Sequence, residues 1–173
     1  MNARPILCLD LATTTGWASG VPGERPVSHK VRFGKTGADD GEVIGKLMQW
    51  LGDYITSTDF GMVVFEAPVG PGMAGRTNFK TMARLVGMCK AVEAVCYLHN
   101  VPVYQASAAT IRKEVLGTGR PENPKAAVMA EMRARGFDPA DDNEADALAL
   151  YFYASALLSD HTTKPRKAAT RRK

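Results

Sequence analysis

The sequence has few cysteines, no long apolar run and no secretory signal, and each absence excludes a class of protein. Its three cysteines are odd in number and form no CxxC pair, which argues against a disulfide framework, so we expect Cys8, Cys89 and Cys96 to be buried free thiols. No apolar run approaches the ~20 residues that a membrane-spanning helix needs. The opening MNARPILCLD lacks the basic, apolar and small-residue order of a signal peptide. We therefore expect an intracellular protein that does not contact a membrane.

Acidic side chains are absent from the last thirteen residues, which contain six basic ones. The net charge of +4 for the 173-residue chain falls to −2 when these six are set aside. We therefore expect one domain over residues 1–160 and a basic, disordered tail over 161–173. Such a tail suits electrostatic contacts with phosphates, although a terminus that only improves solubility would have the same composition.

The apolar pattern of the first 160 residues predicts an α/β fold. Strands are predicted at about 5–11, 13–20, 27–34, 61–68 and 101–106. Helices are predicted at about 40–56, 79–99, 108–115, 124–135 and 142–158. This order indicates a mixed five-stranded sheet, with its first three strands antiparallel, flanked by helices.

Two of the predicted buried strands end in a lone carboxylate, Asp10 in the first and Glu66 in the fourth. Functional groups gather at the carboxyl ends of central strands in α/β sheets, so we expect the two side chains to be neighbours. An unpaired carboxylate is costly to remove from water unless it gains a proton, a partner or a metal. The three threonines and Gly16 that follow Asp10 permit close approach of the backbone to a phosphate, although a plain hairpin turn would need the same residues.

The last predicted helix opens with DDNEADALALYFYA and supplies further acids. Asp142 or Asn143 is the expected N-cap, and Asp146 lies beside the apolar stripe that should face the sheet, one turn from both. Taken singly, each acid is more simply explained as a cap or turn residue. Taken together, they favour a cation, because like charges at that density need neutralising. Oxygen ligands favour Mg²⁺ or Mn²⁺, and two such ions are the usual arrangement for phosphoryl displacement.

Several stretches resemble the RuvC-type Holliday junction resolvases of the ribonuclease H-like superfamily, particularly their phage and prophage members. They are LDLATTTGWA, VVFEAP, VPVYQASAATIRKEVLGTG, NPKAAVMAEM and EADALAL, in the family's order from about Ile6 to Ala156. The resemblance implies a ribonuclease H-like α/β fold and a Mg²⁺-dependent crossover junction endodeoxyribonuclease. It also implies a homodimer that acts on branched DNA in recombination and repair, in the cytoplasm of a bacterium or a phage-infected host cell.

The resemblance also assigns metal ligands. Those of the family carry over to Asp10, Glu66 and Asp146, which would hold two Mg²⁺ ions, with Mn²⁺ as a substitute. The family usually has an acid or a histidine three residues before the last aspartate, and this chain has Asn143. An amide oxygen brings no charge, so either Asn143 or Asp142 is expected as the fourth ligand.

Basic residues near the junction in the family correspond to Lys113 and Lys125. Lys125 is the better candidate for holding the scissile phosphate, although a solvated helix surface explains it equally well. Arg76 and Arg120 lie in two loops rich in glycine and proline, where we expect contacts with branched DNA. Phe79 and the helix behind it are candidates for a dimer interface.

Three alternatives remain open at this point. If an asparagine at position 143 prevents metal binding, the protein would be a noncatalytic branched-DNA binding protein. A ribonuclease H acting on RNA/DNA hybrids differs only in its substrate. A sugar kinase or actin-like ATPase shares the DLATTTG type of turn, but it needs a duplicated domain that 173 residues do not accommodate.

Overall fold

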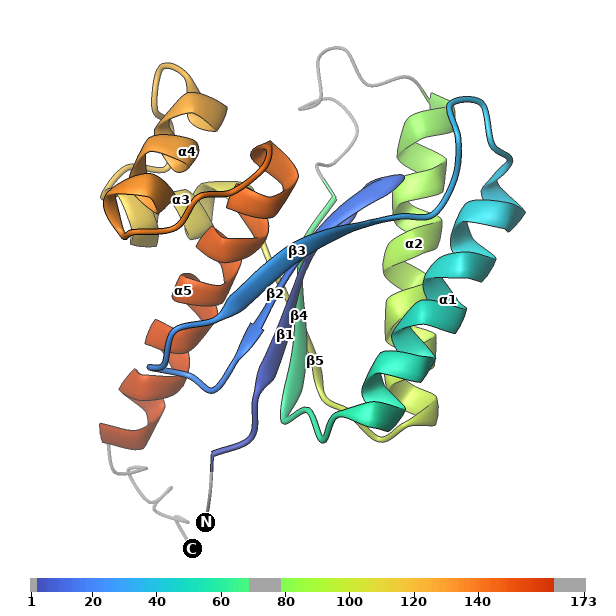
Figure 1. Cartoon of the computed structure of the whole chain (residues 1–173), viewed down its shortest axis with the longest axis horizontal. Helices are drawn as coiled ribbons and strands as arrows, with labels where there is room; N and C mark the ends of the chain where they lie inside the picture. Colours follow the sequence, from blue (N-terminus) through green and yellow to red (C-terminus); the bar gives the residue numbers. More distant parts are fainter. Residues whose placement is uncertain (1–2, 69–78, 164–173) are drawn as a thin grey trace, which may run out of the picture.

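A mixed five-stranded sheet organises the molecule (Figure 1). The computed structural model describes residues 3–68 and 79–163, apart from the side chains of residues 160–163. The strands are β1 (Ile6–Asp10), β2 (Thr14–Gly20), β3 (Val27–Arg32), β4 (Met62–Glu66) and β5 (Val103–Ala106), in the spatial order β3-β2-β1-β4-β5. β2 pairs antiparallel with both β1 and β3, whereas β4 pairs parallel with both β1 and β5. The predicted sheet, with its first three strands antiparallel, is confirmed.

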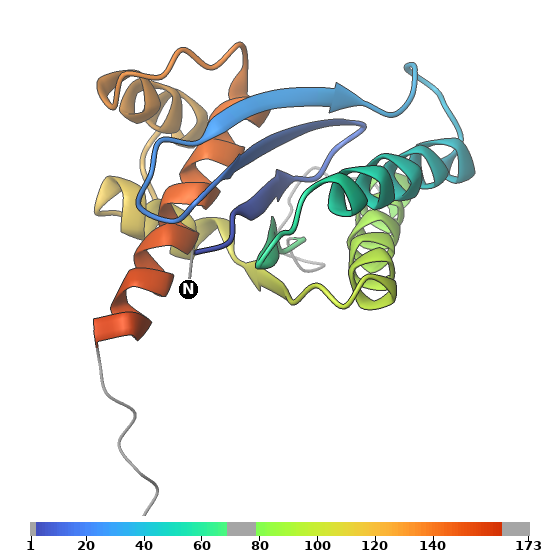
Figure 2. The same ribbon diagram turned by 60° about the horizontal axis from the view of Figure 1, so that its bottom comes forward.

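Helices cover both faces of the sheet. The helices α1 (Asp40–Ser57) and α2 (Phe79–Leu98) pack together on one face. The other face is covered by α5 (Asp142–Thr163), with α3 (Ala108–Leu116) and α4 (Pro124–Ala134) packed against α5, as Figures 1 and 2 show. The predicted helices agree with these bounds to within a few residues, except that α5 continues five residues past its predicted end.

Alternation along the central strands divides the apolar side chains between the two layers. In β1, Ile6 and Cys8 pack on the α5 side, and Leu7 and Leu9 pack on the side of α1 and α2. All four are buried, which explains why the strand reads as a continuous apolar run instead of an alternating one. The three cysteines are buried and free, as expected.

The central position of α5 determines its composition. Between Ala145 and Ala154 it is buried on almost every side, because it lies between the sheet and the pair α3 and α4. Farther from the start of α5, the Tyr151 hydroxyl donates to the carbonyl oxygens of Val21 (2.5 Å) and Glu24 (3.1 Å) and so fixes the helix to the β2–β3 turn. Among the described residues, no helix combines the length and the apolarity needed to cross a membrane.

Candidate active site

The two strand-terminal carboxylates lie side by side and face the same helix. Asp10 ends β1 and Glu66 ends β4, and the parallel register of these strands places the two residues next to each other. Side chains alternate along a strand, so Asp10 shares a face with Cys8, and Glu66 shares a face with Val64. Cys8 and Val64 both belong to the core under α5. Both acids therefore point to the face that α5 covers.

The start of α5 is fixed by an unexpected cap. Asp141 accepts a hydrogen bond from the Glu144 backbone N–H on its Oδ1 atom (3.1 Å), so it is the N-cap in place of the predicted Asp142 or Asn143. The Glu144 side chain is buried, and it accepts hydrogen bonds from Ser28 Oγ on β3 (2.7 Å) and from a backbone N–H just before the helix (3.0 Å). The first turn of α5 is thereby bound to the sheet, and Asp142 and Asn143 are left free of the capping role.

Gly16 allows that first turn to lie directly on β2. A Cβ atom at Gly16 would lie 1.9 Å from the carbonyl oxygen of Asn143, so no other residue fits without moving the helix. The turn before Gly16 is closed by Thr15, whose hydroxyl donates to the Ala12 carbonyl oxygen (2.7 Å). Gly16 therefore allows the first turn of α5 to lie against the end of the sheet, and Thr15 closes the turn that leads to it.

Asp10, Glu66 and Asp146, which we call the acidic cluster, act on one another electrostatically. Burial, followed by the charges of Asp146 and Glu66, raises the pKa of Asp10 from 3.8 to about 8. Burial and the charge of Asp146 raise the pKa of Glu66 from 4.5 to about 7. Burial raises the pKa of Asp146 from 3.8 to about 6, and the charge of Asp142 adds to this rise. The predicted acids are therefore within electrostatic reach of one another, and Asp142 belongs to the same neighbourhood.

Two cations from separate helices oppose this repulsion. Arg112 on α3 lowers the pKa values of Glu66 and Asp146, and Lys125 in the first turn of α4 lowers that of Asp10. Lys125 also donates a hydrogen bond to Asp142, which raises the pKa of the lysine. Neither cation adjoins an acid of the cluster in the sequence, so only the fold brings these charges together.

Sequence reasoning singled out Lys113 and missed its neighbour Arg112. The buried residues of α3 are Ile111 and Val115. At 100° per residue, Lys113 lies opposite this stripe and Arg112 lies at its border, beside the acidic cluster. Lys113 instead lines a surface depression together with Arg120. The helical spacing was thus the signal that distinguishes the two adjacent basic residues.

The donor chemistry of this site suits a hard divalent cation. Carboxylates are the ligands that Mg²⁺ and Mn²⁺ prefer, and a bound cation would relieve the repulsion that raises all three pKa values of the cluster. In the side-chain positions observed, residues 3–68 and 79–159 contain no group of three or more histidine, cysteine, aspartate or glutamate side chains placed to share an ion. Arg76 and residues 164–173 of the basic tail lie outside the described residues.

Comparison with known proteins identifies the fold. No family model and no curated protein matches the chain. Among solved structures, it is similar to Thermus thermophilus RuvC, with a TM-score of 0.74 and 19% identity over 93% of this chain and 99% of that one. T. thermophilus RuvC in complex with a Holliday junction substrate gives a TM-score of 0.71 and 16% identity, over 94% and 99%. The yeast mitochondrial Holliday junction resolvase Ydc2 gives a TM-score of 0.59 and 10% identity, over 92% of this chain and 83% of that one. The predicted RuvC-type, ribonuclease H-like fold is confirmed.

Proposed function

We propose that this protein is a structure-specific endonuclease that hydrolyses phosphodiester bonds in four-way or otherwise branched DNA. The observation that carries the proposal is the acidic cluster, in which two acids end adjacent parallel strands and the third lies in α5, which covers them. The overall fold supports it, because the similar T. thermophilus RuvC was solved with a Holliday junction substrate. The proposed enzyme class is a Mg²⁺-dependent crossover junction endodeoxyribonuclease.

The acidic cluster is proposed to hold two Mg²⁺ ions, for which Mn²⁺ can substitute. Bound divalent ions supply an activated water and neutralise charge on the attacking and leaving oxygens of the phosphodiester. Asp10, Glu66 and Asp146 provide the charged ligands. Asn143 and Asp142, both in the first turn of α5, are the two candidates for a fourth ligand.

Arg112 and Lys125 are proposed to hold the scissile phosphate. Both act on the acidic cluster electrostatically, and positively charged donors stabilise the negative charge of a phosphoryl group through the reaction. In the free protein Lys125 donates to Asp142, and its two remaining N–H groups can donate to a phosphate.

The wider DNA surface and the assembly are also part of the proposal. Lys113, Arg120, Arg76 and the basic tail of residues 161–173 are proposed to contact the arms of branched DNA. A homodimer would supply one active site for each cut strand, and Phe79 at the start of α2 is 89% exposed, as an interface residue in a free protomer would be. The proposed location is the cytoplasm of a bacterium or of a phage-infected host cell.

The test is a cleavage assay on matched substrates. A labelled four-way junction, a linear duplex and an RNA/DNA hybrid are incubated with the wild type and with Asp10→Asn, in Mg²⁺, in Mn²⁺ and in a chelator. Paired symmetric nicks in the junction alone, lost in the variant and in the chelator, are the expected result. Junction binding without cleavage in either metal would identify a noncatalytic binding protein. Preferential cleavage of the hybrid would identify a ribonuclease H.

A further inference from the structure

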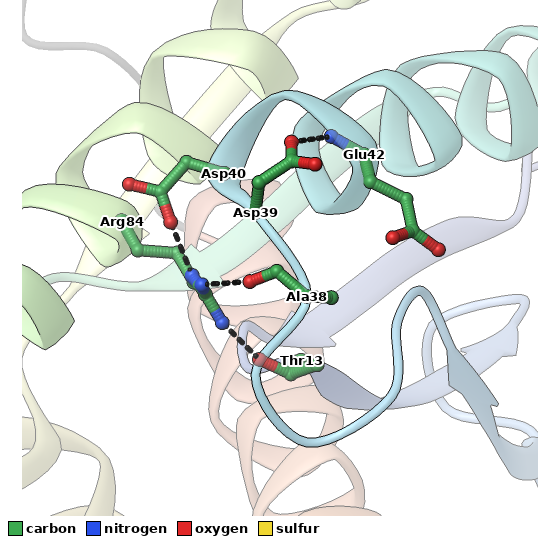
Figure 3. A network of polar contacts seen from close by, with 6 residues as sticks. All are labelled: Thr13, Ala38, Asp39, Asp40, Glu42 and Arg84. Atoms are coloured by element: carbon green, nitrogen blue, oxygen red, sulfur yellow. Dashed lines mark hydrogen bonds and ion pairs between the residues drawn. The ribbon is translucent and has the colours of Figure 1, made fainter.

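One arginine joins three segments that are distant in the sequence, one of which is the turn that follows Asp10. Arg84 of α2 donates from Nε to Asp40 Oδ1 (2.6 Å), from Nη2 to the Ala38 carbonyl oxygen (2.6 Å) and from Nη1 to Thr13 Oγ1 (3.3 Å), as Figure 3 shows. The Arg84 side chain is only 17% exposed. Hydrogen bonds from a charged donor are about twice as strong as neutral ones, and a partly buried guanidinium that lost them would be left unpaired.

The Thr13 contact reaches the turn that follows Asp10. This turn joins β1 to β2, and Phe33 at the end of β3 donates its backbone N–H to the Thr13 carbonyl oxygen (2.9 Å). Thr13 is thus held by its backbone from β3 and by its side chain from α2. The charges of the other acids of the cluster repel the Asp10 carboxylate. The backbone around Asp10 must therefore hold this carboxylate near them against the repulsion. The turn is thus restrained from two directions, three residues after Asp10.

The same arginine connects the elements that follow both strand-terminal acids. Asp10 is followed by the turn that contains Thr13, and Glu66 is followed in the chain by α2, which carries Arg84. Asp40 and Ala38, at the entry to α1, hold the guanidinium in the orientation in which Nη1 points to Thr13. The planar fork of arginine can serve all three partners at once, whereas the point charge of lysine cannot.

We propose that Arg84 is a positioning residue, which sets the placement of Asp10 relative to Glu66 and thereby the affinity of the acidic cluster for divalent cations. This inference rests on the proposed function, because it assumes that the cluster binds such ions. Arg84 acts through the Thr13 turn and does not touch the substrate or the ions.

The test measures metal binding directly, in the absence of DNA. Mn²⁺ is titrated into the wild type, Arg84→Gln, Arg84→Lys and Thr13→Val, and free Mn²⁺ is followed by electron paramagnetic resonance. Arg4→Gln is the matched control, because Arg4 also pairs with an aspartate, Asp59 (2.9 Å), but at an exposed site. Melting temperature, junction affinity in a chelator and cleavage at varied Mg²⁺ are measured on the same proteins.

We expect Arg84→Gln to raise the Mn²⁺ dissociation constant by about tenfold, the size of effect seen for groups that orient metal ligands, with a matching rise in the Mg²⁺ needed for cleavage. Junction affinity in the chelator should stay within about twofold of the wild type, since the phosphate contacts are unchanged. Arg84→Lys should restore part of the affinity, because it retains the pair with Asp40. Thr13→Val should weaken binding by about threefold and add nothing in the Arg84→Gln background.

Separate outcomes overturn the two proposals. A folded Arg84→Gln with wild-type Mn²⁺ affinity shows that Arg84 is only structural. If that variant does not fold, an unchanged affinity in Thr13→Val overturns the inference in its place. A wild type that binds Mn²⁺ and cleaves no DNA refutes the nuclease and leaves the Arg84 comparison valid. A wild type that binds no Mn²⁺ refutes both.

Discussion

Replacing Asp10 with asparagine should stabilise the metal-free protein at alkaline pH. The folded state raises the pKa of Asp10 to about 8 from 3.8, so between these values the folded protein holds a proton that the unfolded chain has released. A folded state that binds more protons loses stability as pH rises, so the free energy of unfolding should fall from about pH 4 to about pH 8. Glu66 and Asp146 act in the same direction, up to about pH 7 and about pH 6.

The size of the effect follows from the shift. A change from 3.8 to about 8 corresponds to ~6 kcal/mol, which is a ceiling for Asp10 when its neighbours stay ionised. The acidic cluster titrates as a coupled set, because a proton on any one acid relieves the others, and Asp10 is only partly buried. We therefore expect Asp10→Asn to gain about 1–3 kcal/mol at pH 8 and close to nothing at about pH 4, where the native aspartic acid is already neutral.

The assay is urea unfolding of the wild type and the variant at several pH values, with and without Mg²⁺. Asp53→Asn is the control, because Asp53 is an exposed acid of α1. The difference in unfolding free energy between the two variants removes the contribution of the other titrating groups. Mg²⁺ at pH 8 should stabilise the wild type and have little effect on Asp10→Asn. If Asp10→Asn destabilises the protein equally at pH 5 and pH 8, Asp10 is not a repelled, partly buried carboxylate and the proposed metal site loses its basis.

Three further substitutions test the surroundings of the acidic cluster. Gly16→Ala forces a Cβ atom against the Asn143 carbonyl oxygen, so it should cost about 3 kcal/mol in urea unfolding and abolish cleavage by displacing the first turn of α5. Arg112→Gln removes a charge that lowers two pKa values of the cluster, so the pH of half-maximal cleavage should rise by about 0.5–1 unit in a pH–rate profile. Lys125→Met should slow cleavage of saturating junction by about 100-fold, whereas Lys113→Met, the control, should change only DNA affinity, in a binding titration.

The sheet and the strand-terminal acids were predictable because their signals are local. A buried apolar run followed by a single acid and a turn is visible in the sequence around Asp10 and again around Glu66. The parallel pairing of β1 with β4 then places the two acids together, since carboxyl ends of parallel strands meet at one edge. The caps of α1 and α3 were equally local: Asp39 and Ser107 each accept a hydrogen bond from a backbone N–H in the helix that follows.

The rest of the site depends on contacts that leave no local pattern. Asp141, the true cap of α5, stands in a run of polar residues, any of which has capping chemistry, and only the backbone geometry selects it. Gly16 is required by a helix that begins more than a hundred residues later. Arg84 reads as an ordinary polar position of an amphipathic helix, because its partners lie in two other segments. The role of each of these residues depends on tertiary contacts that form only in the folded chain.

The charge balance at the cluster sets an expectation for the proposed metal binding and for the effect of Asn143 on it. Among the described residues, four carboxylates and two cations act on one another: Asp10, Glu66, Asp146, Asp142, Arg112 and Lys125. Fully ionised, they sum to −2, which a single divalent ion cancels. A second ion leaves an excess of +2, and the neutral amide of Asn143 does nothing to offset it, as an acid at that position would. A phosphodiester brings one negative charge and halves this excess, so in the proposed two-ion site the second ion should bind more favourably together with DNA than without it.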